Sequence, residues 1–373
     1  MEEKFYRDSW VEVNLDHIIY NIQQLKNKLA DKTQIYAVVK ANAYGHGDIE
    51  VANAALKGGA TRLAVAILDE ALRLRQGGIT APILVMGWIR PEDAEIAAKH
   101  NITVTCYQKE WLEEVQKLTL PKPLTVHLKW DTGMGRIGIR TEQELLEIIP
   151  LLQHENIYLE AIFTHFATAD EAKLAHFEKQ LTQFDKLWNI FQNNWTQHKV
   201  MVHTGNSAAS MRFPEKMVDF VRFGISMYGL YPSPVVKTEK PIDLKSALSL
   251  HSRLIHVKKV DKGTPISYGA TYLAEEQEWI GTVPLGYADG IRRALQGAEV
   301  LVGGERCTIV GRVCMDQLMV RLTKPAKVGD KVTLIGSQGA ERIEMDEWAA
   351  RLDTINYEIA CMISDRVPRV YSQ

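Results

Sequence analysis

The stretch Ile35-Tyr-Ala-Val-Val-Lys-Ala-Asn-Ala-Tyr-Gly-His-Gly47 joins a short apolar run to a glycine-containing loop that begins with a lysine. An apolar run of five residues, rich in β-branched side chains and bounded by a loop, is typical of a buried strand. The next residues, Asp48 to Lys57, repeat apolar side chains with helical spacing. The stretch therefore predicts a strand, a loop and a helix, with Lys40 at the carboxyl end of the strand.

The same order of strand and helix recurs along the first 225 residues. Eight apolar runs are predicted strands: Ile35 to Val39, Leu63 to Leu68, Ile83 to Met86, Ile102 to Cys106, Leu124 to Trp130, Tyr158 to Thr164, Val200 to His203 and Phe220 to Ile225. Amphipathic segments such as Glu142 to Gln153 and Glu171 to Asn193 separate them, and another, Leu15 to Leu29, precedes the first. Eight such units favour an α/β fold with a closed (β/α)8 barrel of the TIM type, and an open sheet of similar strand count is the alternative.

The pattern changes after Pro232-Ser-Pro234. Six predicted strands follow, with glycine-containing turns between them: Leu248 to Val260, Trp279 to Leu285, Val300 to Val302, Cys307 to Val313, Gln317 to Leu322 and Lys331 to Ile335. One short helix is expected from Asp346 to Leu352. We therefore expect two domains, a barrel domain of residues 1–235 and a mostly β domain of residues 236–373. The first ~12 residues are able to pack with the mostly β domain.

Composition and charge exclude several classes of protein. The 373 residues carry 44 Lys and Arg against 46 Asp and Glu, a balance that offers no basic surface for nucleic acid or anionic lipid. No apolar run reaches the ~18 residues of a membrane span, and residues 1–10 lack the apolar core of a secretory signal. Four scattered cysteines favour reduced thiols, and no cluster of His, Cys, Asp and Glu has metal-ligand spacing. We expect a cytoplasmic protein without a metal, a nucleic-acid partner or a membrane partner.

Reactive side chains follow several of the predicted barrel strands, where functional residues of such barrels collect. A lysine placed behind an apolar strand is costly to bury unless it is paired or used covalently. Burial lowers the pKa of a lysine and leaves its amine nucleophilic, which suits Schiff-base chemistry, whereas a structural salt bridge is the alternative for Lys40. Glycine and serine after the last two strands are typical of a phosphate site. A lysine together with a phosphate site suggests pyridoxal phosphate (PLP).

Ten motifs in chain order carry a resemblance to one family. They are WVEVNL (10–15), AVVKANAYGHG (37–47), KWDTGMGRIG (129–138), FTHFA (163–167), NSAA (206–209), RFGI (222–225), SYG (267–269), GYADG (286–290), GRVCMD (311–316) and TINYE (354–358). Nearly from end to end, the chain resembles the bacterial alanine racemases, which are fold-type III PLP enzymes. The resemblance implies an enzyme that interconverts L- and D-alanine and supplies D-alanine for peptidoglycan.

The resemblance also implies which residues do the chemistry. Lys40 would hold PLP covalently and act as one catalytic base, and Tyr268 would act as the base on the opposite face of Cα. A racemase needs two such groups because a proton removed from one face must be returned to the other. Tyr268 and Met315 would come from the partner subunit, so the resemblance implies a head-to-tail homodimer with shared active sites.

Further residues match those that bind the cofactor and the substrate in the family. The PLP phosphate would be held by Tyr44, Ser207, Gly224, Ile225 and Tyr357. Arg222 matches the partner of the ring nitrogen, and His165 matches a residue beside the ring. Arg136 and the backbone of Met315 match the groups that bind the substrate carboxylate. Lys129 matches a lysine that is carbamylated in some members of the family.

Several alternatives remain open at this stage. GMGRIG (133–138), with Glu160 about twenty residues further on, also fits the pattern of a dinucleotide site. A serine racemase or an amino-acid decarboxylase of the same fold type is a second alternative, although a decarboxylase should lack the opposed tyrosine at Tyr268. A non-catalytic PLP carrier is a third, but such carriers resemble only the first half of the chain. His203 fits either a hydrogen-bonded strand histidine or a catalytic group.

Overall fold

The computed structural model describes residues 5–373, which fall into two compact units. The barrel unit contains His17–Ala43 and Asp48–Lys245. The second unit contains the described residues up to Asp16, together with Tyr44–Gly47 and Ser246–Gln373. The boundary expected between residues 235 and 236 stays a prediction.

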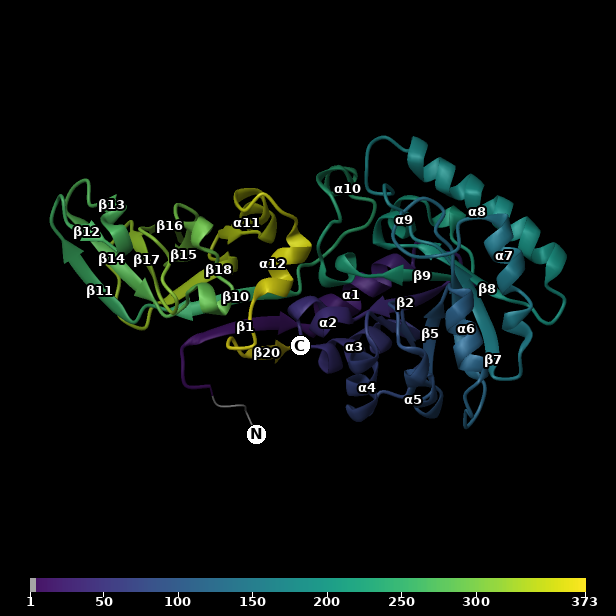
Figure 1. Cartoon of the computed structure of the whole chain (residues 1–373). Helices are drawn as coiled ribbons and strands as arrows, with labels where there is room; N and C mark the ends of the chain where they lie inside the picture. The colour runs from purple at the N-terminus through teal and green to yellow at the C-terminus, as the bar shows by residue number, and fades with distance from the viewer. Residues whose placement is uncertain (1–4) are drawn as a thin grey trace. The chain divides into compact units, whose positions relative to one another are not determined.

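The barrel unit is a closed sheet of parallel strands in the order β2-β3-β4-β5-β6-β7-β8-β9. The strands are β2 (Gln34–Val38), β3 (Arg62–Val65), β4 (Ile83–Val85), β5 (Ile102–Cys106), β6 (Leu124–Lys129), β7 (Ile157–Phe163), β8 (Met201–Gly205) and β9 (Phe220–Phe223). The α-helices are α1 (Leu15–Lys26), α2 (Lys40–Gly45), α3 (Asp48–Gly58), α4 (Leu68–Gln76), α5 (Ala94–Lys99), α6 (Lys109–Gln116), α7 (Glu142–Ile148), α8 (Ala175–Asn194), α9 (Ser207–Arg212) and α10 (Pro234–Glu239). Figure 1 labels β2, β5, β7, β8 and β9 of this sheet, with helices such as α6 and α8 around it. The predicted (β/α)8 barrel is confirmed.

The barrel strands are mostly apolar because both of their faces are buried. One face packs against the surrounding helices, and the other fills the inside of the barrel. Every residue of β5 is buried, for example. Some strand positions are buried and polar, notably His127 and His203, which have no exposed surface, and Arg222, which is 3% exposed. Buried polar groups need hydrogen-bond partners, so these three side chains must be paired inside the barrel.

The loop after β2 takes an unusual backbone conformation. In α2, all four residues from Ala41 to Tyr44 have φ between 51° and 53°, which makes this turn left-handed. The left-handed conformation costs roughly 1–2 kcal/mol for each residue other than glycine. Several hydrogen bonds hold the turn. The N–H of Ala41 donates to Glu70 (2.6 Å), that of Ala43 to the carbonyl of Val39 (3.0 Å), and that of Asp48 to Asn42 (3.0 Å). Such strain is concentrated at functional sites, and here it follows directly on Lys40.

Two predicted strands are too long because their apolar residues continue into a helix. The run predicted from Leu63 to Leu68 ends as a strand at Val65, and Leu68 begins α4. The run predicted to Ile225 ends as a strand at Phe223, and Ile225 begins the short helix η4 (Ile225–Tyr228). Apolar side chains are needed at the start of both helices for packing, so hydrophobicity alone does not mark where the strands end.

The second unit is built on a ten-stranded sheet, whose main path is β11-β14-β17-β16-β15-β18-β10-β1-β20. These strands are β1 (Ser9–Asn14), β10 (Leu248–Arg253), β11 (His256–Val260), β14 (Glu278–Val283), β15 (Glu299–Val302), β16 (Glu305–Val310), β17 (Leu318–Leu322), β18 (Lys331–Gln338) and β20 (Arg369–Ser372), and β19 (Glu341–Ile343) pairs with β18. Strands β12 (Pro265–Ile266) and β13 (Tyr272–Leu273) form a separate pair. The predicted mostly β character is confirmed, but the run from Leu248 to Val260 is two strands, and α12 (Asn356–Met362) follows the predicted helix, observed as α11 (Met345–Arg351).

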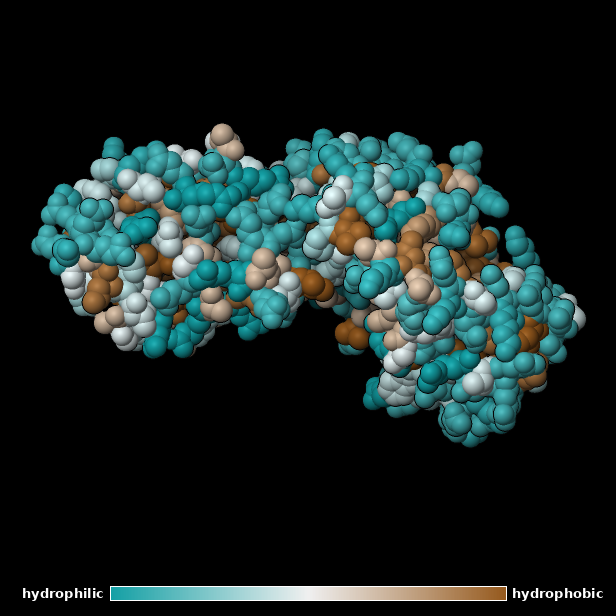
Figure 2. Space-filling model, turned by 90° about the horizontal axis from the view of Figure 1, so that it is seen from above, coloured by the Kyte–Doolittle hydropathy of each residue, from teal (hydrophilic) through white to brown (hydrophobic). Residues whose placement is uncertain are grey.

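Hydrophilic residues dominate the face drawn in Figure 2, and hydrophobic residues lie among them in small groups. Among residues 5–373, no helix has the length and apolar character that crossing a bilayer requires.

Candidate active site

Eight residues predicted for the site lie at or just beyond the carboxyl ends of barrel strands: Lys40, Lys129, Arg136, His165, Ser207, Arg222, Gly224 and Ile225. In a closed parallel barrel these ends share one rim, so the fold brings the residues together. Electrostatics agree with this placement. Burial lowers the pKa of His165 well below its usual value, and the charges of Arg222, Lys129, Arg136 and Lys40 lower it further.

Lys129 ends β6 as a buried cation among other cations. Its side chain is 4% exposed, and its Nζ lies 5.2 Å from the centre of the Phe163 ring. Burial lowers the pKa of Lys129 to about 7, and repulsion from Arg136 and Arg222 adds to the shift, whereas Asp131 opposes it. A substantial share of Lys129 is therefore an uncharged amine at neutral pH.

Arg222, next to the last residue of β9, is a buried guanidinium whose hydrogen bonds go to neutral groups. It donates to the carbonyl oxygens of His203 (2.9 Å), Thr164 (2.7 Å) and Thr204 (3.1 Å). It also donates to Nδ1 of His203 (2.7 Å) and lies 3.3 Å from Nδ1 of His165. Burial lowers the pKa of Arg222 to about 9. A guanidinium held in this way leaves its positive charge for an electron-rich ligand.

The Asp131 carboxylate shapes the loop that carries Arg136. Its Oδ1 accepts hydrogen bonds from the backbone N–H groups of Gly133 (3.1 Å), Met134 (2.8 Å) and Gly135 (2.9 Å). A dinucleotide-binding loop would instead offer such N–H groups to a pyrophosphate. The N–H groups of residues 133–135 already bind Asp131, so they are not available to a pyrophosphate. The glycine pattern at 133–138 is therefore explained by this loop, which carries the exposed Arg136.

The loops after β8 and β9 form a site suited to a phosphate. Asn206 caps α9 by accepting from the N–H of Ala209 (3.0 Å), and Ser207 begins that helix. The Ser207 hydroxyl oxygen accepts from the N–H of Gly224 at 2.9 Å, which joins the two loops. Barrels commonly bind phosphate after these last two strands.

The residues at this rim fit PLP, as judged by the chemistry of their side chains. Lys40, Arg136 and Arg222 supply positive charge. Asp131, the carboxylate that raises the pKa of Lys129, already accepts three backbone N–H groups. PLP carries a phosphate and a phenolic oxygen that would balance such charge. Lys40 would hold the cofactor, Ser207 and the Gly224 loop would hold its phosphate, and Arg222 would lie at its ring.

The other predicted site residues belong to the second unit. Tyr44 and Tyr357 lie together there, with ring centres 6.2 Å apart, and burial raises the pKa of Tyr44. Tyr268 begins the short helix η5 (Tyr268–Ala270) and is 68% exposed, and Met315 is 53% exposed. Large side chains this exposed are available to a partner.

Two polar residues inside the barrel, Arg62 and His127, were not predicted from the sequence, and Glu160 was considered only as the acidic residue of a dinucleotide site. Glu160 accepts hydrogen bonds from Arg62 (2.9 Å) and His127 (2.9 Å), and His127 in turn contacts His203 (2.9 Å). The signal was present, because His127 and Glu160 interrupt runs that are otherwise apolar. A polar residue in the middle of a buried strand needs a partner and should have been singled out.

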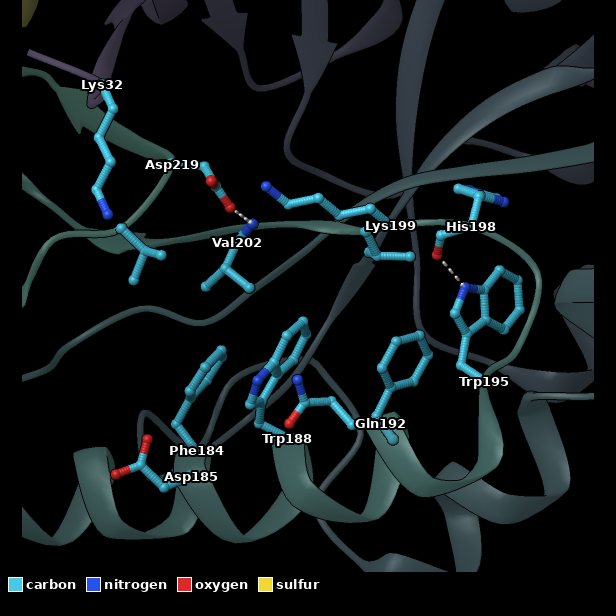
Figure 3. A pocket seen from close by; sticks show the side chains of 13 residues that line it. Lys32, Phe184, Asp185, Trp188, Gln192, Trp195, His198, Lys199, Val202 and Asp219 are labelled. Carbon is cyan, nitrogen blue, oxygen red and sulfur yellow. Dashed lines mark hydrogen bonds between the residues drawn. The ribbon is translucent and has the colours of Figure 1, made fainter.

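The barrel unit also has a separate cleft of about 600 Å³, whose lining side chains are drawn in Figure 3. It is lined by aromatic residues of α8 and by the segments that enter β8 and β9, including Trp188, Trp195, Lys199 and Asp219. These segments precede the amino ends of their strands, whereas the active sites of such barrels lie at the carboxyl ends. The cleft contains none of the predicted site residues.

Two family models match the chain: "Alanine racemase, N-terminal domain" over residues 13–232 and "Alanine racemase, C-terminal domain" over residues 247–371. The alanine racemase of Geobacillus stearothermophilus is 54% identical over 370 residues, which is 98% of this chain and 94% of that protein. Alanine racemase 1 of Bacillus subtilis is 50% identical and covers 98% of this chain and 94% of its own length.

Solved structures agree with the relatives found by sequence. The alanine racemase from Bacillus anthracis with bound L-Ala-P superposes with a TM-score of 0.96 at 49% identity, covering 99% of this chain and 96% of that one. A histidine racemase from Leuconostoc mesenteroides superposes with a TM-score of 0.92 at 31% identity, covering 99% of both chains.

Proposed function

The chain belongs to the alanine racemase family and interconverts L- and D-alanine with the help of PLP, and from that premise we propose that Lys40 and Tyr268 are its two bases. The observation that supports Lys40 most is its place at the end of a barrel strand, among Lys129, Arg136 and Arg222. PLP, when bound, withdraws electrons from an attached amino acid and makes its Cα proton acidic. Lys40 and Tyr268 would each remove or return that proton at one face of Cα.

The remaining site residues would bind and orient the reactants. Arg136 and the backbone of Met315 would hold the substrate carboxylate. His165 would lie beside the PLP ring, and Arg222 would face the ring nitrogen. The phosphate would be held by Tyr44, Ser207, Gly224, Ile225 and Tyr357, through hydroxyl and backbone N–H groups. Fixing the substrate in this way lets each base reach its own face of Cα without reorientation.

We propose that the working enzyme is a homodimer in which Tyr268 and Met315 complete the partner's barrel rim. The exposure of both side chains, 68% and 53%, supports a surface that another copy covers. Light scattering of the purified protein should give twice the mass of the chain. A monomer with full activity would contradict the proposal. From the family alone, we further propose that the enzyme acts in the cytoplasm and supplies D-alanine for peptidoglycan, which complementation of a D-alanine auxotroph would test.

Substrate range can be measured directly. The loss of optical rotation of L-alanine, L-serine and L-histidine should be followed separately with the same enzyme. We expect alanine to be racemised fastest. The chain is 54% identical to the alanine racemase of Geobacillus stearothermophilus but only 31% identical to the histidine racemase. Release of carbon dioxide in place of racemisation would assign the site to a decarboxylase.

Replacing Arg222 with glutamate is expected to raise the yield of transaminated side product per turnover by about tenfold or more, the factor that corresponds to 1.4 kcal/mol. A guanidinium disfavours a proton on the ring nitrogen by like-charge repulsion, and a carboxylate would favour it. The pyruvate formed per alanine racemised measures the effect, with the exposed Arg253→Glu as the control. An unchanged ratio in Arg222→Glu would contradict the role given to Arg222.

Lys129 is expected to form a carbamate with dissolved carbon dioxide. Its neutral amine would attack the carbon, and a C–N bond would form while one C–O π bond breaks and gives its electron pair to oxygen. One proton would leave the nitrogen for solvent, so that the product is a carbamate anion. Because the pKa of Lys129 is lowered to about 7, the neutral amine, and with it the carbamate at fixed dissolved carbon dioxide, should increase between about pH 6 and pH 8. Carbon-13 NMR with labelled carbon dioxide should detect a signal that Lys129→Met lacks. Absence of that signal from the wild type at the upper pH would contradict the proposal.

A further inference from the structure

A row of five side chains crosses the inside of the barrel and ends on Arg222. Arg62 of β3 donates to Oε1 of Glu160 in β7 at 2.9 Å. Oε2 of Glu160 lies 2.9 Å from Nε2 of His127 in β6, and Nδ1 of His127 lies 2.9 Å from Nε2 of His203 in β8. Nδ1 of His203 lies 2.7 Å from Nη1 of Arg222 in β9. The catalytic scheme above uses only the last member of this row.

Two register shifts in the barrel sheet lie at members of this row, and the first turns a side chain toward the inside of the barrel. Phe163 and Glu160 are three positions apart in β7, so regular alternation would place them on opposite faces. The register between β6 and β7 shifts at His127, which pairs with Ala161, while Val126 pairs with Leu159. Glu160 is therefore the extra residue of a bulge, a device that redirects a side chain. A second register shift lies between His203 and Gly205, at the other end of the row.

The two histidine rings are enclosed on all sides. His127 and His203 have no exposed surface. The His203 ring stacks on Phe163 with centres 4.6 Å apart, and Tyr36 packs against both imidazoles at 6.2 Å and 5.4 Å. Burial lowers the pKa of both histidines, so both rings are neutral. Each ring therefore carries one proton. Whether the proton is on Nδ1 or Nε2 depends on which neighbouring groups donate and which accept hydrogen bonds.

The ends of the row determine where those protons are. Arg222 only donates, so Nδ1 of His203 must accept and Nε2 of His203 must carry the proton. That proton points to Nδ1 of His127, which must accept as well. Nε2 of His127 then carries a proton that it donates to Glu160. The His127 hydrogen bond and Arg62 outweigh desolvation and lower the pKa of Glu160, so it is ionised and accepts at both oxygens.

We propose that Glu160 and His127 are positioning residues for the racemase reaction, because they hold His203 in the tautomer that presents a bare Nδ1 to Arg222. The proposal rests on the role given to Arg222 above, since its purpose is to fix the guanidinium that faces the cofactor ring. The bulge at Glu160 supports it, because a packing role alone would be met by an apolar residue in regular register.

The substitution Glu160→Gln should reverse the direction of the hydrogen bonds that link position 160, His127 and His203. Arg62 would bind the amide oxygen, so the amide NH2 group would face Nε2 of His127 and require it to accept. The proton of His127 would then move to Nδ1 and that of His203 would do the same. An N–H group of His203 would now oppose an N–H group of Arg222, and the hydrogen bond between them would be lost. The double variant Arg62→Met/Glu160→Gln should undo this, because its amide oxygen is available to His127.

The test is nitrogen-15 NMR of histidine-labelled holoenzyme, since ring nitrogens with and without a proton have different shifts. Signals are assigned by their loss in His127→Gln and His203→Gln. We expect the proton on Nε2 of both rings in the wild type, on Nδ1 in Glu160→Gln, and on Nε2 again in the double variant. Glu12→Gln is the matched control, because Glu12 also lies beside a buried histidine, His251, at 4.0 Å, in the second unit. The proton on Nδ1 of His203 in the wild type would overturn the proposal, whatever the variants do.

The yield of transaminated side product gives the second readout. Glu160→Gln should raise it about tenfold, the effect of losing one buried hydrogen bond, whereas Glu12→Gln and the double variant should leave it near the wild-type value. If Glu160→Gln reverses the tautomers but leaves the side product unchanged, while Arg222→Glu raises it, the positioning role is wrong and the role of Arg222 stands. If neither variant raises it, the role of Arg222 is itself wrong.

Discussion

Replacing Lys40 with alanine is expected to lower kcat for racemisation in both directions by more than about 10⁴-fold. The variant loses a catalytic base and the amine that holds the cofactor. Lys40 begins the left-handed turn after β2, whereas Lys129 ends β6, which does not pair with β2, so Lys129 is not placed to take over its role. A coupled D-amino-acid oxidase assay measures the loss. The control is Lys32→Ala, an exposed lysine beside the cleft at the other end of the barrel.

A small amine added to the Lys40→Ala enzyme separates a chemical role from a structural one. The amine would replace the missing base in solution, so we expect a partial recovery that grows with amine concentration. Recovery would also establish that the variant is folded. A Lys40→Ala enzyme with more than about a tenth of wild-type activity would contradict the assignment of Lys40.

Replacing Tyr268 with phenylalanine is expected to lower kcat by about 10²- to 10⁴-fold in both directions, because each direction needs one group to remove the proton and the other to return it. In deuterated water, the antipode whose Cα proton faces Lys40 should still exchange that proton without changing configuration. The other antipode should lose its exchange. Tyr158→Phe, an exposed tyrosine on the outside of the barrel, is the control. Equal exchange of both antipodes in Tyr268→Phe would contradict the two-base scheme.

The fold could be predicted because its strands are apolar on both faces and recur with helices between them. The run from Ile102 to Cys106 matches β5 at both ends. The ends of strands were harder to predict where buried apolar residues continue into the next element, as at Leu68. They were also harder to predict where a strand ends without glycine or proline, as between Arg253 and His256. The left-handed turn at Ala41 to Tyr44 contains no glycine, so its sequence gives no sign of its backbone.

The site was predicted from motifs more than from chemistry. The ten motifs point to residues that face the reactants in the family, such as Lys40 and Arg222. They gave no reason to single out His127 or to pair it with Glu160, because both residues lie outside the ten motifs, and Glu160 was considered only for a dinucleotide site. Glu160 also stands where regular alternation would turn it away from the interior, and only the observed bulge explains its inward position. Such supporting residues become visible when strand register is known.

The central claim is that Lys40 of one subunit and Tyr268 of the other serve the same active site, and a mixed dimer tests it most directly. Lys40→Ala and Tyr268→Phe chains carrying different affinity tags are produced together, and the dimer that carries both tags is isolated. One of its two sites would contain both changes and the other neither. We expect about half the activity of the wild-type dimer, although each parent is nearly inactive. A mixed dimer as inactive as its parents would contradict the claim.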